Sequence, residues 1–204
     1  MTAPAPCLTS AYRDKSVLVT GGSGFIGRHL CRRLHELGAR VTGTYLDHLP
    51  DDTGTTWQHT DLTDVDAVQS VFDEVGPDYV FHLAGSVFGD RGIDAVLPTL
   101  ANNLVASVHV MMAARSLRHC KRLVITNSQE EPSQADAGIV PVSPYAASKF
   151  ASSAYARMFH ALYGLRTVII DMGLRKEKLL FWIFNCMGVL ITALLLVIYF
   201  TRNY

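Results

Sequence analysis

From Lys15 onward, short apolar runs rich in Val and Ile alternate with longer amphipathic segments. This alternation constrains the fold strongly, because strands joined by helices lie parallel in one sheet and need helices over both of its faces. The pattern predicts strands at residues 16–20, 40–45, 56–58, 79–83, 122–126 and 167–170, and helices at residues 25–37, 64–75, 100–117 and 144–163. The expected fold class is α/β, a doubly wound parallel sheet with helices on both faces.

Three glycines stand between the first predicted strand and the first predicted helix. Gly21, Gly24 and Gly27 form a GxxGxxG pattern within residues 20–27, TGGSGFIG. The free N–H groups and the dipole of a helix entrance favour a pyrophosphate at such a place. Gly21 permits the tight turn, Gly24 lets the backbone approach the phosphates, and Gly27 allows the helix to pack closely on the strand. The sequence therefore predicts a Rossmann-type domain that binds a dinucleotide.

Tyr145 and Lys149 form a YxxxK pattern on the last predicted helix, where side chains four residues apart share one face. An ammonium group near a phenol favours the phenolate and lowers the tyrosine pKa from its free value of about 10. Tyr145 could then exchange a proton with a substrate hydroxyl or carbonyl as a general acid/base. Taken alone, the pattern is frequent by chance and fits an ordinary pair on a helix surface better.

The glycine spacing, with Phe25 and Ile26 before the last glycine, resembles that of the extended short-chain dehydrogenase/reductase family. Most members of that family act on nucleotide sugars. The resemblance implies a catalytic Ser or Thr at the end of the fifth strand, where this chain has Ser128. It also implies that Tyr145 is the acid/base and that Lys149 holds the nicotinamide ribose. Three matching elements in the right order favour an active site over a chance pair.

The same resemblance implies further contacts to the cofactor. An acid after the third strand contacts the adenine ring in that family, and Asp61 stands there, whereas Asp64 fits a helix cap equally well. The turn after the fourth strand and the Asn of a family NVxGT helix also match. The full predicted cofactor set is Gly21, Gly24, Phe25, Ile26, Gly27, Asp61, Leu62, Leu83, Ala84, Gly85, Asn103, Tyr145 and Lys149.

The sequence leaves open whether the cofactor is NAD or NADP. In NAD-binding members an acid at the end of the second strand holds the ribose 2′-hydroxyl, and NADP-binding members replace it. Tyr45 stands at the expected position, and Asp47 follows two residues later. Arg28 and Arg32 on the first helix could instead reach a 2′-phosphate.

An acidic stretch follows Ser128. In sugar dehydratases of the family a Glu two residues after the catalytic Thr removes a ring proton, and Glu130 aligns with it, although a solvated loop acid is an equal alternative. Ser in place of Thr at position 128 favours a reductase or an epimerase over a dehydratase. Segments 41–45, 76–83 and 143–149 resemble the branch that handles GDP-mannose derivatives, particularly its 4-keto-6-deoxy-mannose reductases.

Beyond the last predicted strand the chain departs from the family pattern, and we expect the sugar-binding lobe of the family to be absent. Residues 179–200 carry no charged side chain and would span roughly 33 Å as a helix, enough to cross a bilayer. Basic residues concentrate before this segment, which predicts a single-pass membrane helix with the Rossmann domain on the cytoplasmic side. A buried C-terminal helix is the alternative. The expected organisation is a disordered lead (1–13), an NAD(P)-binding Rossmann domain (14–172), a basic linker (173–178), the membrane helix (179–200) and a tail (201–204).

Composition narrows the function classes. Lys plus Arg and Asp plus Glu both number 18, so nothing indicates a nucleic-acid partner. The four cysteines, Cys7, Cys31, Cys120 and Cys186, lack metal-ligand spacing, and we expect no metal site. The first hypothesis is a truncated, membrane-tethered NAD(P)-dependent nucleotide-sugar epimerase, dehydratase or reductase, as a monomer or a homodimer. The second is a non-catalytic cofactor-binding subunit of a membrane complex, and the third is a degenerate or fused gene product.

Overall fold

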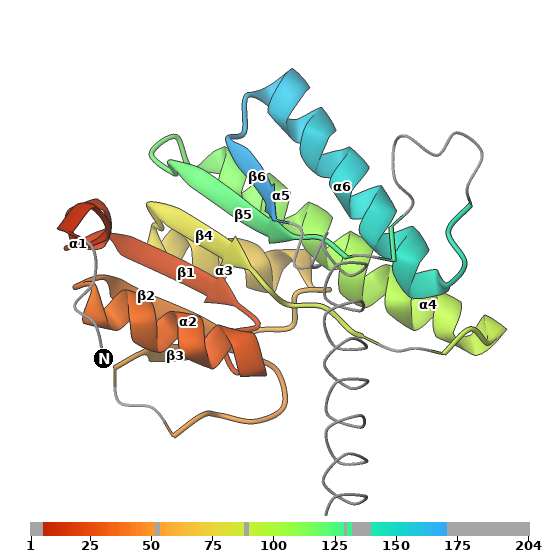
Figure 1. The fold of residues 1–204 in the computed structure, drawn as a ribbon, viewed down its shortest axis with the longest axis horizontal. Coiled ribbons are helices and arrows are strands. Elements are labelled where there is room, and N and C mark those ends of the chain that lie inside the picture. Colours follow the sequence, from red (N-terminus) through yellow and green to blue (C-terminus); the bar gives the residue numbers. More distant parts are fainter. Residues whose placement is uncertain (1–5, 52–53, 88–89, 129, 132–139, 171–204) are drawn as a thin grey trace, which may run out of the picture. The chain divides into compact units, whose positions relative to one another are not determined.

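The computed structural model describes residues 6–51, 54–87, 90–128, 130–131 and 140–170. In this part of the chain six parallel strands form one sheet in the order β3-β2-β1-β4-β5-β6 (Figure 1). The strands are β1 (Ser16–Thr20), β2 (Arg40–Tyr45), β3 (Thr56–His59), β4 (Tyr79–His82), β5 (Arg122–Thr126) and β6 (Thr167–Ile170). The predicted α/β class with a parallel Rossmann-like sheet is confirmed.

Helices connect the strands and account for most of the remaining described residues. They are α1 (Pro6–Tyr12), α2 (Phe25–Glu36), α3 (Val65–Val75), the 3-10 turn η1 (Ile93–Ala95), α4 (Val96–Thr99), the π-helical turn η2 (Leu100–Val105), α5 (Ala106–Ser116) and α6 (Pro144–Tyr163). The four predicted helices correspond to α2, α3, the stretch from η2 to α5, and α6.

Successive side chains of β1 face opposite layers of helices. Val17 and Val19 pack with Cys31 and Leu34 of α2 on one face of the sheet. Leu18 faces the other layer, which α3, α5 and α6 form together. Because both faces are covered, every residue of β1 is buried, and the three central residues, Val17, Leu18 and Val19, form an apolar run in the sequence. Helices therefore cover both faces, as predicted.

Local capping explains why two helices begin and end where the sequence predicts. The Asp64 carboxylate accepts hydrogen bonds of 2.9 and 3.2 Å from two backbone N–H groups in the first turn of α3. Ser143 accepts one of 3.0 Å in the first turn of α6. Gly76 and Gly164 follow the two helices with φ of 51° and 67°, a left-handed conformation that glycine adopts at little cost.

The N-terminal segment differs from the prediction. Residues 1–13 were expected to be a disordered lead, whereas Pro6–Tyr12 form α1. The Tyr12 ring lies 5.3 Å from the Tyr79 ring and 6.4 Å from the Phe81 ring, centre to centre. Aromatic side chains of β4 thus give α1 a surface to pack on, which a local sequence pattern does not reveal.

The helix before β5 begins earlier than predicted. Helical turns run without a break from Ile93 to Ser116, a stretch long and apolar enough to cross a membrane by length and composition alone. Val110 and Met111 are completely buried in the core, so this stretch packs as a layer of the domain. The predicted basic linker (173–178), membrane helix (179–200) and tail (201–204) lie outside the described residues.

Candidate functional site

The glycine turn closes tightly on the carboxyl end of β4. Gly21 has φ of 66°, and a Cβ built on it would lie 2.6 Å from the backbone nitrogen of Ala84. A Cβ on Gly27 would collide with the Gly21 carbonyl oxygen. A Cβ on Gly24 would meet one atom within 4 Å, the Gly21 carbonyl oxygen at 3.2 Å. Gly21 and Gly27 are therefore needed for packing, while Gly24 leaves its backbone open to a ligand.

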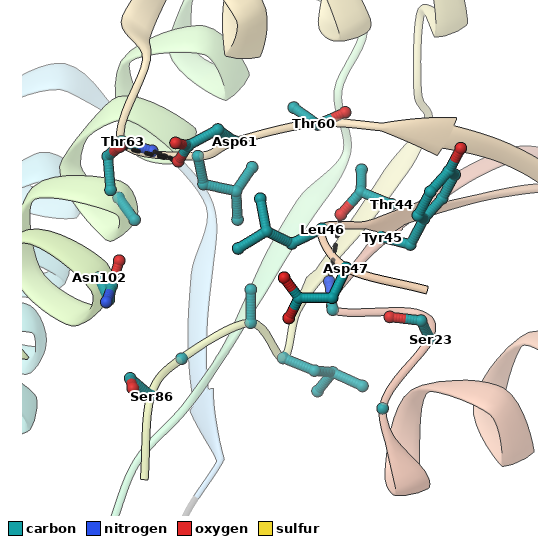
Figure 2. A pocket seen from close by; sticks show the side chains of 17 residues that line it. Ser23, Thr44, Tyr45, Leu46, Asp47, Thr60, Asp61, Thr63, Ser86 and Asn102 are labelled. Carbon is teal, nitrogen blue, oxygen red and sulfur yellow. Dashed lines mark hydrogen bonds between the residues drawn. The ribbon is translucent and has the colours of Figure 1, made fainter. Parts of the chain in front are cut away.

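A hollow of about 340 Å³ lies between this turn and the ends of β2 and β3 (Figure 2). Figure 2 shows Asp47, just after β2, with its carboxylate directed into the hollow. Thr44, on β2, accepts a hydrogen bond of 3.2 Å from the Gly21 backbone N–H. Asp61, on the far wall, accepts hydrogen bonds from the backbone N–H and the hydroxyl of Thr63 at 2.8 and 2.7 Å, and these lower the pKa of its carboxyl group.

A second hollow, of about 310 Å³, continues from the first toward α6. The two share four lining residues, Gly21, Gly24, Leu83 and Gly85, and so form one cleft along the carboxyl ends of the strands. Ligands of doubly wound sheets bind at this edge. Twelve of the thirteen predicted cofactor residues line one hollow or the other; these are Gly21, Gly24, Phe25, Ile26, Gly27, Asp61, Leu62, Leu83, Ala84, Gly85, Tyr145 and Lys149.

The remaining predicted cofactor residue, Asn103, lies behind the cleft. Its side chain is buried and bonds both backbone groups of Ser86, which lines the first hollow. The Ser86 N–H donates to Asn103 Oδ1 at 2.6 Å, and Asn103 Nδ2 donates to the Ser86 carbonyl at 3.0 Å. Asn103 therefore shapes the wall of the cleft.

Tyr145 and Lys149 line the second hollow together, as their spacing predicts. Lys149 is buried, and its Nζ donates a hydrogen bond of 3.2 Å to the carbonyl of Thr126 at the end of β5. Burial lowers the pKa of the Lys149 ammonium group, and the charge of Glu131 opposes that shift. The arrangement places a cation beside the half-buried Tyr145 in the same cleft.

Glu130 and Glu131, the two acidic residues after Ser128, make different contacts. Ser128 Oγ accepts a hydrogen bond of 3.3 Å from the Glu130 N–H. The carboxylate of Glu130 accepts one of 3.0 Å from Ser143 Oγ, the residue that caps α6. This contact holds the predicted ring-proton base at the first turn of α6.

Glu131 is a site residue that the sequence analysis missed. Its carboxylate accepts hydrogen bonds from the Ser128 N–H at 3.1 Å and from Ser153 Oγ at 3.0 Å. Half-burial raises the pKa of the Glu131 carboxyl group. Ser153 lies four residues after Lys149 on α6, and that spacing is the signal that could have placed the partner of this carboxylate on the same helix face as Lys149.

The sequence profile of the NAD dependent epimerase/dehydratase family matches residues 17–173. The chain belongs to this family. The dTDP-glucose 4,6-dehydratase of Haemophilus influenzae is 27% identical over 184 residues, which cover 76% of this chain and 54% of the relative. The UDP-glucose 4-epimerase of Mycolicibacterium smegmatis is 32% identical over 166 residues, which cover 72% and 52%. The predicted family resemblance is confirmed, and the GDP-mannose branch stays a prediction.

Solved structures of other proteins share the fold. The epimerase Mth375 of Methanothermobacter thermautotrophicus aligns with a TM-score of 0.69 at 27% identity, covering 80% of this chain and 52% of that one. The Bordetella bronchiseptica enzyme WbmF in complex with NAD+ and UDP aligns with a TM-score of 0.64 at 27% identity, covering 79% and 50%. The chain thus spans about half the length of the relatives it matches.

Proposed function

We propose that this chain binds NAD and transfers hydride between its nicotinamide and a carbon atom of a nucleotide sugar. The observation that carries the proposal is the single cleft that joins the glycine turn to Tyr145 and Lys149. Its open backbone at Gly24, with a helix entrance behind it, fits a pyrophosphate. Support for the substrate class comes from the family, which includes dTDP-glucose dehydratases and UDP-glucose epimerases.

Asp47 favours NAD over NADP. Its carboxylate lines the half of the cleft that lies against the glycine turn and β2, where it would accept hydrogen bonds from ribose hydroxyls and repel a 2′-phosphate. Arg28 and Arg32 are exposed on α2 and do not line this hollow. The choice that the sequence left open is therefore proposed to be NAD.

Tyr145 is proposed to move the proton. NAD supplies the hydride acceptor, the chemistry that the protein lacks. As the C–H bond of a sugar carbinol gives up its hydride, the Tyr145 phenolate accepts the hydroxyl proton and a carbonyl forms; the reverse reaction returns both. Lys149 is proposed to hold the nicotinamide ribose, and Ser128 is proposed to hydrogen-bond the reacting oxygen. Glu130 could act as the dehydratase base only after its carboxylate breaks the hydrogen bond with Ser143 Oγ.

Binding calorimetry of NADH and NADPH with the detergent-solubilised full chain tests the cofactor step. We expect NADH to bind with a dissociation constant between about 1 µM and 1 mM and NADPH to bind more weakly. Gly24→Asp should abolish binding, because its carboxylate would occupy the pyrophosphate position. Gly92→Asp is the matched control, since Gly92 is also an exposed N-cap glycine in an extended conformation. Equal binding by both variants would contradict the proposed site.

We also propose that residues 179–200 tether the domain to a membrane and leave it on the cytoplasmic side. The uncharged segment and the basic residues before it support this location. Alkaline extraction of membranes from cells that express the full chain should leave the protein in the pellet. Release of the intact chain into the supernatant would contradict the tether.

A further inference from the structure

A line of buried polar side chains crosses the domain beneath the cleft. Thr20 ends β1 and His82 ends β4, while Ser107 and Asn103 belong to the long helical stretch. All four are 3% exposed or less. Thr20 Oγ1 lies 2.7 Å from His82 Nδ1, and His82 Nε2 lies 2.9 Å from Ser107 Oγ. The Ser107 hydroxyl in turn donates to the backbone carbonyl of Asn103.

These contacts determine the tautomer of His82. The Asn103 carbonyl can only accept, so it takes the single hydroxyl proton of Ser107. Ser107 Oγ must then accept from His82 Nε2, which therefore carries the ring proton. Nδ1 is left as an acceptor for the Thr20 hydroxyl. Both ring nitrogens of His82 and the hydroxyls of Thr20 and Ser107 thus have partners of the correct kind, and burial of the ring keeps it neutral.

Both ends of the line touch walls of the cleft. Thr20 precedes Gly21, and His82 precedes the Leu83-Ala84-Gly85 turn on which Gly21 packs. At the other end, the Asn103 side chain holds Ser86 and also donates to Ser148 Oγ on α6 at 3.1 Å. The line therefore joins the glycine turn, the β4 turn and the helix that carries Tyr145.

We propose that His82, as the Nε2–H tautomer, is a positioning residue that holds these three segments in the arrangement that binds the cofactor. This inference rests on the proposed function for its effect on NAD binding. The tautomer of His82 is a property of the protein alone and does not depend on the proposed function. His82 does not touch the cleft, so its effect is transmitted through Thr20 and Ser107.

Long-range ¹H–¹⁵N spectra of the full chain test the tautomer without any cofactor. His82 is assigned by the signal that disappears in His82→Gln. We expect a protonated Nε2 and an unprotonated Nδ1 that keep their shifts from about pH 8 to about pH 5. A protonated Nδ1, or a titration within that range, would overturn the proposal whether or not NAD binds.

Calorimetry with NADH tests the positioning role. Ser107→Ala leaves His82 Nε2 without its acceptor and should weaken NADH binding about tenfold, whereas Ser107→Thr keeps a hydroxyl and should restore most of the affinity. Ser152→Ala is the matched control, because Ser152 is equally buried but donates only to backbone carbonyls. Wild-type affinity in a folded Ser107→Ala variant would overturn the positioning role. Failure of the wild type to bind NADH would instead overturn the proposed function, and with it the proposed effect of His82 on NAD binding. The spectra would still test the tautomer of His82 in that case.

Discussion

Mild acid should destabilise this domain through one buried side chain, His82. Complete burial, aided by the positive charge of Lys149, lowers the pKa of His82 from 6.5 to about 3. The unfolded chain therefore binds a proton between these two values that the folded chain does not bind. By linkage, the contribution of His82 is complete above the unfolded pKa and is lost progressively as the pH falls below it.

The size of the effect follows from the same shift. The slope reaches at most about 1.4 kcal/mol per pH unit, and the loss between pH 8 and pH 5 is about 2 kcal/mol. At pH 5 the folded ring is still unprotonated, so the loss depends on the unfolded pKa and not on the exact folded value. His82→Gln should abolish this contribution, because glutamine does not titrate but can still offer one acceptor and one donor.

Urea unfolding of the full chain, followed by far-UV circular dichroism, measures the effect as a double difference. The free energy of unfolding is compared between the wild type and His82→Gln at about pH 8 and again at about pH 5, so that the carboxyl groups common to both proteins cancel. We expect the wild type to lose about 2 kcal/mol more than the variant. An equal loss in the two proteins would show that His82 titrates alike in the folded and unfolded states and would refute the reasoning.

Four further substitutions give three separate tests. Lys149→Met should raise the melting temperature by about 2–4 °C for each kcal/mol by which burial of the Lys149 charge destabilises the fold, and it should abolish hydride transfer. A lower melting temperature in scanning calorimetry would contradict the destabilising effect of this buried charge. Asp47→Asn should shift the ratio of NADPH to NADH affinity in favour of NADPH by about tenfold in calorimetric titrations, and an unchanged ratio would remove Asp47 from the cofactor site. Gly27→Ala should lower the free energy of unfolding in urea by about 3 kcal/mol, because its Cβ collides with the Gly21 backbone. Gly24→Ala should lower it by less than about 1 kcal/mol. Similar losses in the two variants would contradict the different roles of the two glycines.

Most of the sheet could be predicted because its signals are local. The buried strands are short apolar runs, and Asp64, Ser143, Gly76 and Gly164 mark helix ends through contacts within one or two turns. The helix α1 could not be predicted this way, because it packs through Tyr12 on side chains of β4 far along the chain.

The same distinction holds for the candidate site. The glycine turn and the Tyr145–Lys149 pair are local patterns, and the structure brings them into one cleft. The contacts of Glu131 and of His82 were not predicted, because their partners, Ser153 and Ser107, come from other elements. Asn103 was found by its motif, but it lies behind the cleft and bonds Ser86 of the cleft wall.

Hydride transfer to NAD+ on the full chain tests the central claim most directly. The full chain is mixed with NAD+ and, in separate samples, UDP-glucose or dTDP-glucose, and the absorbance of reduced nicotinamide is recorded with the wild type and with Tyr145→Phe. We predict that reduced nicotinamide forms in the wild type with at least one of the two sugars and is lost in Tyr145→Phe, because phenylalanine cannot accept the hydroxyl proton. Tight NADH binding without any reduction would contradict the catalytic account and favour a non-catalytic cofactor-binding subunit.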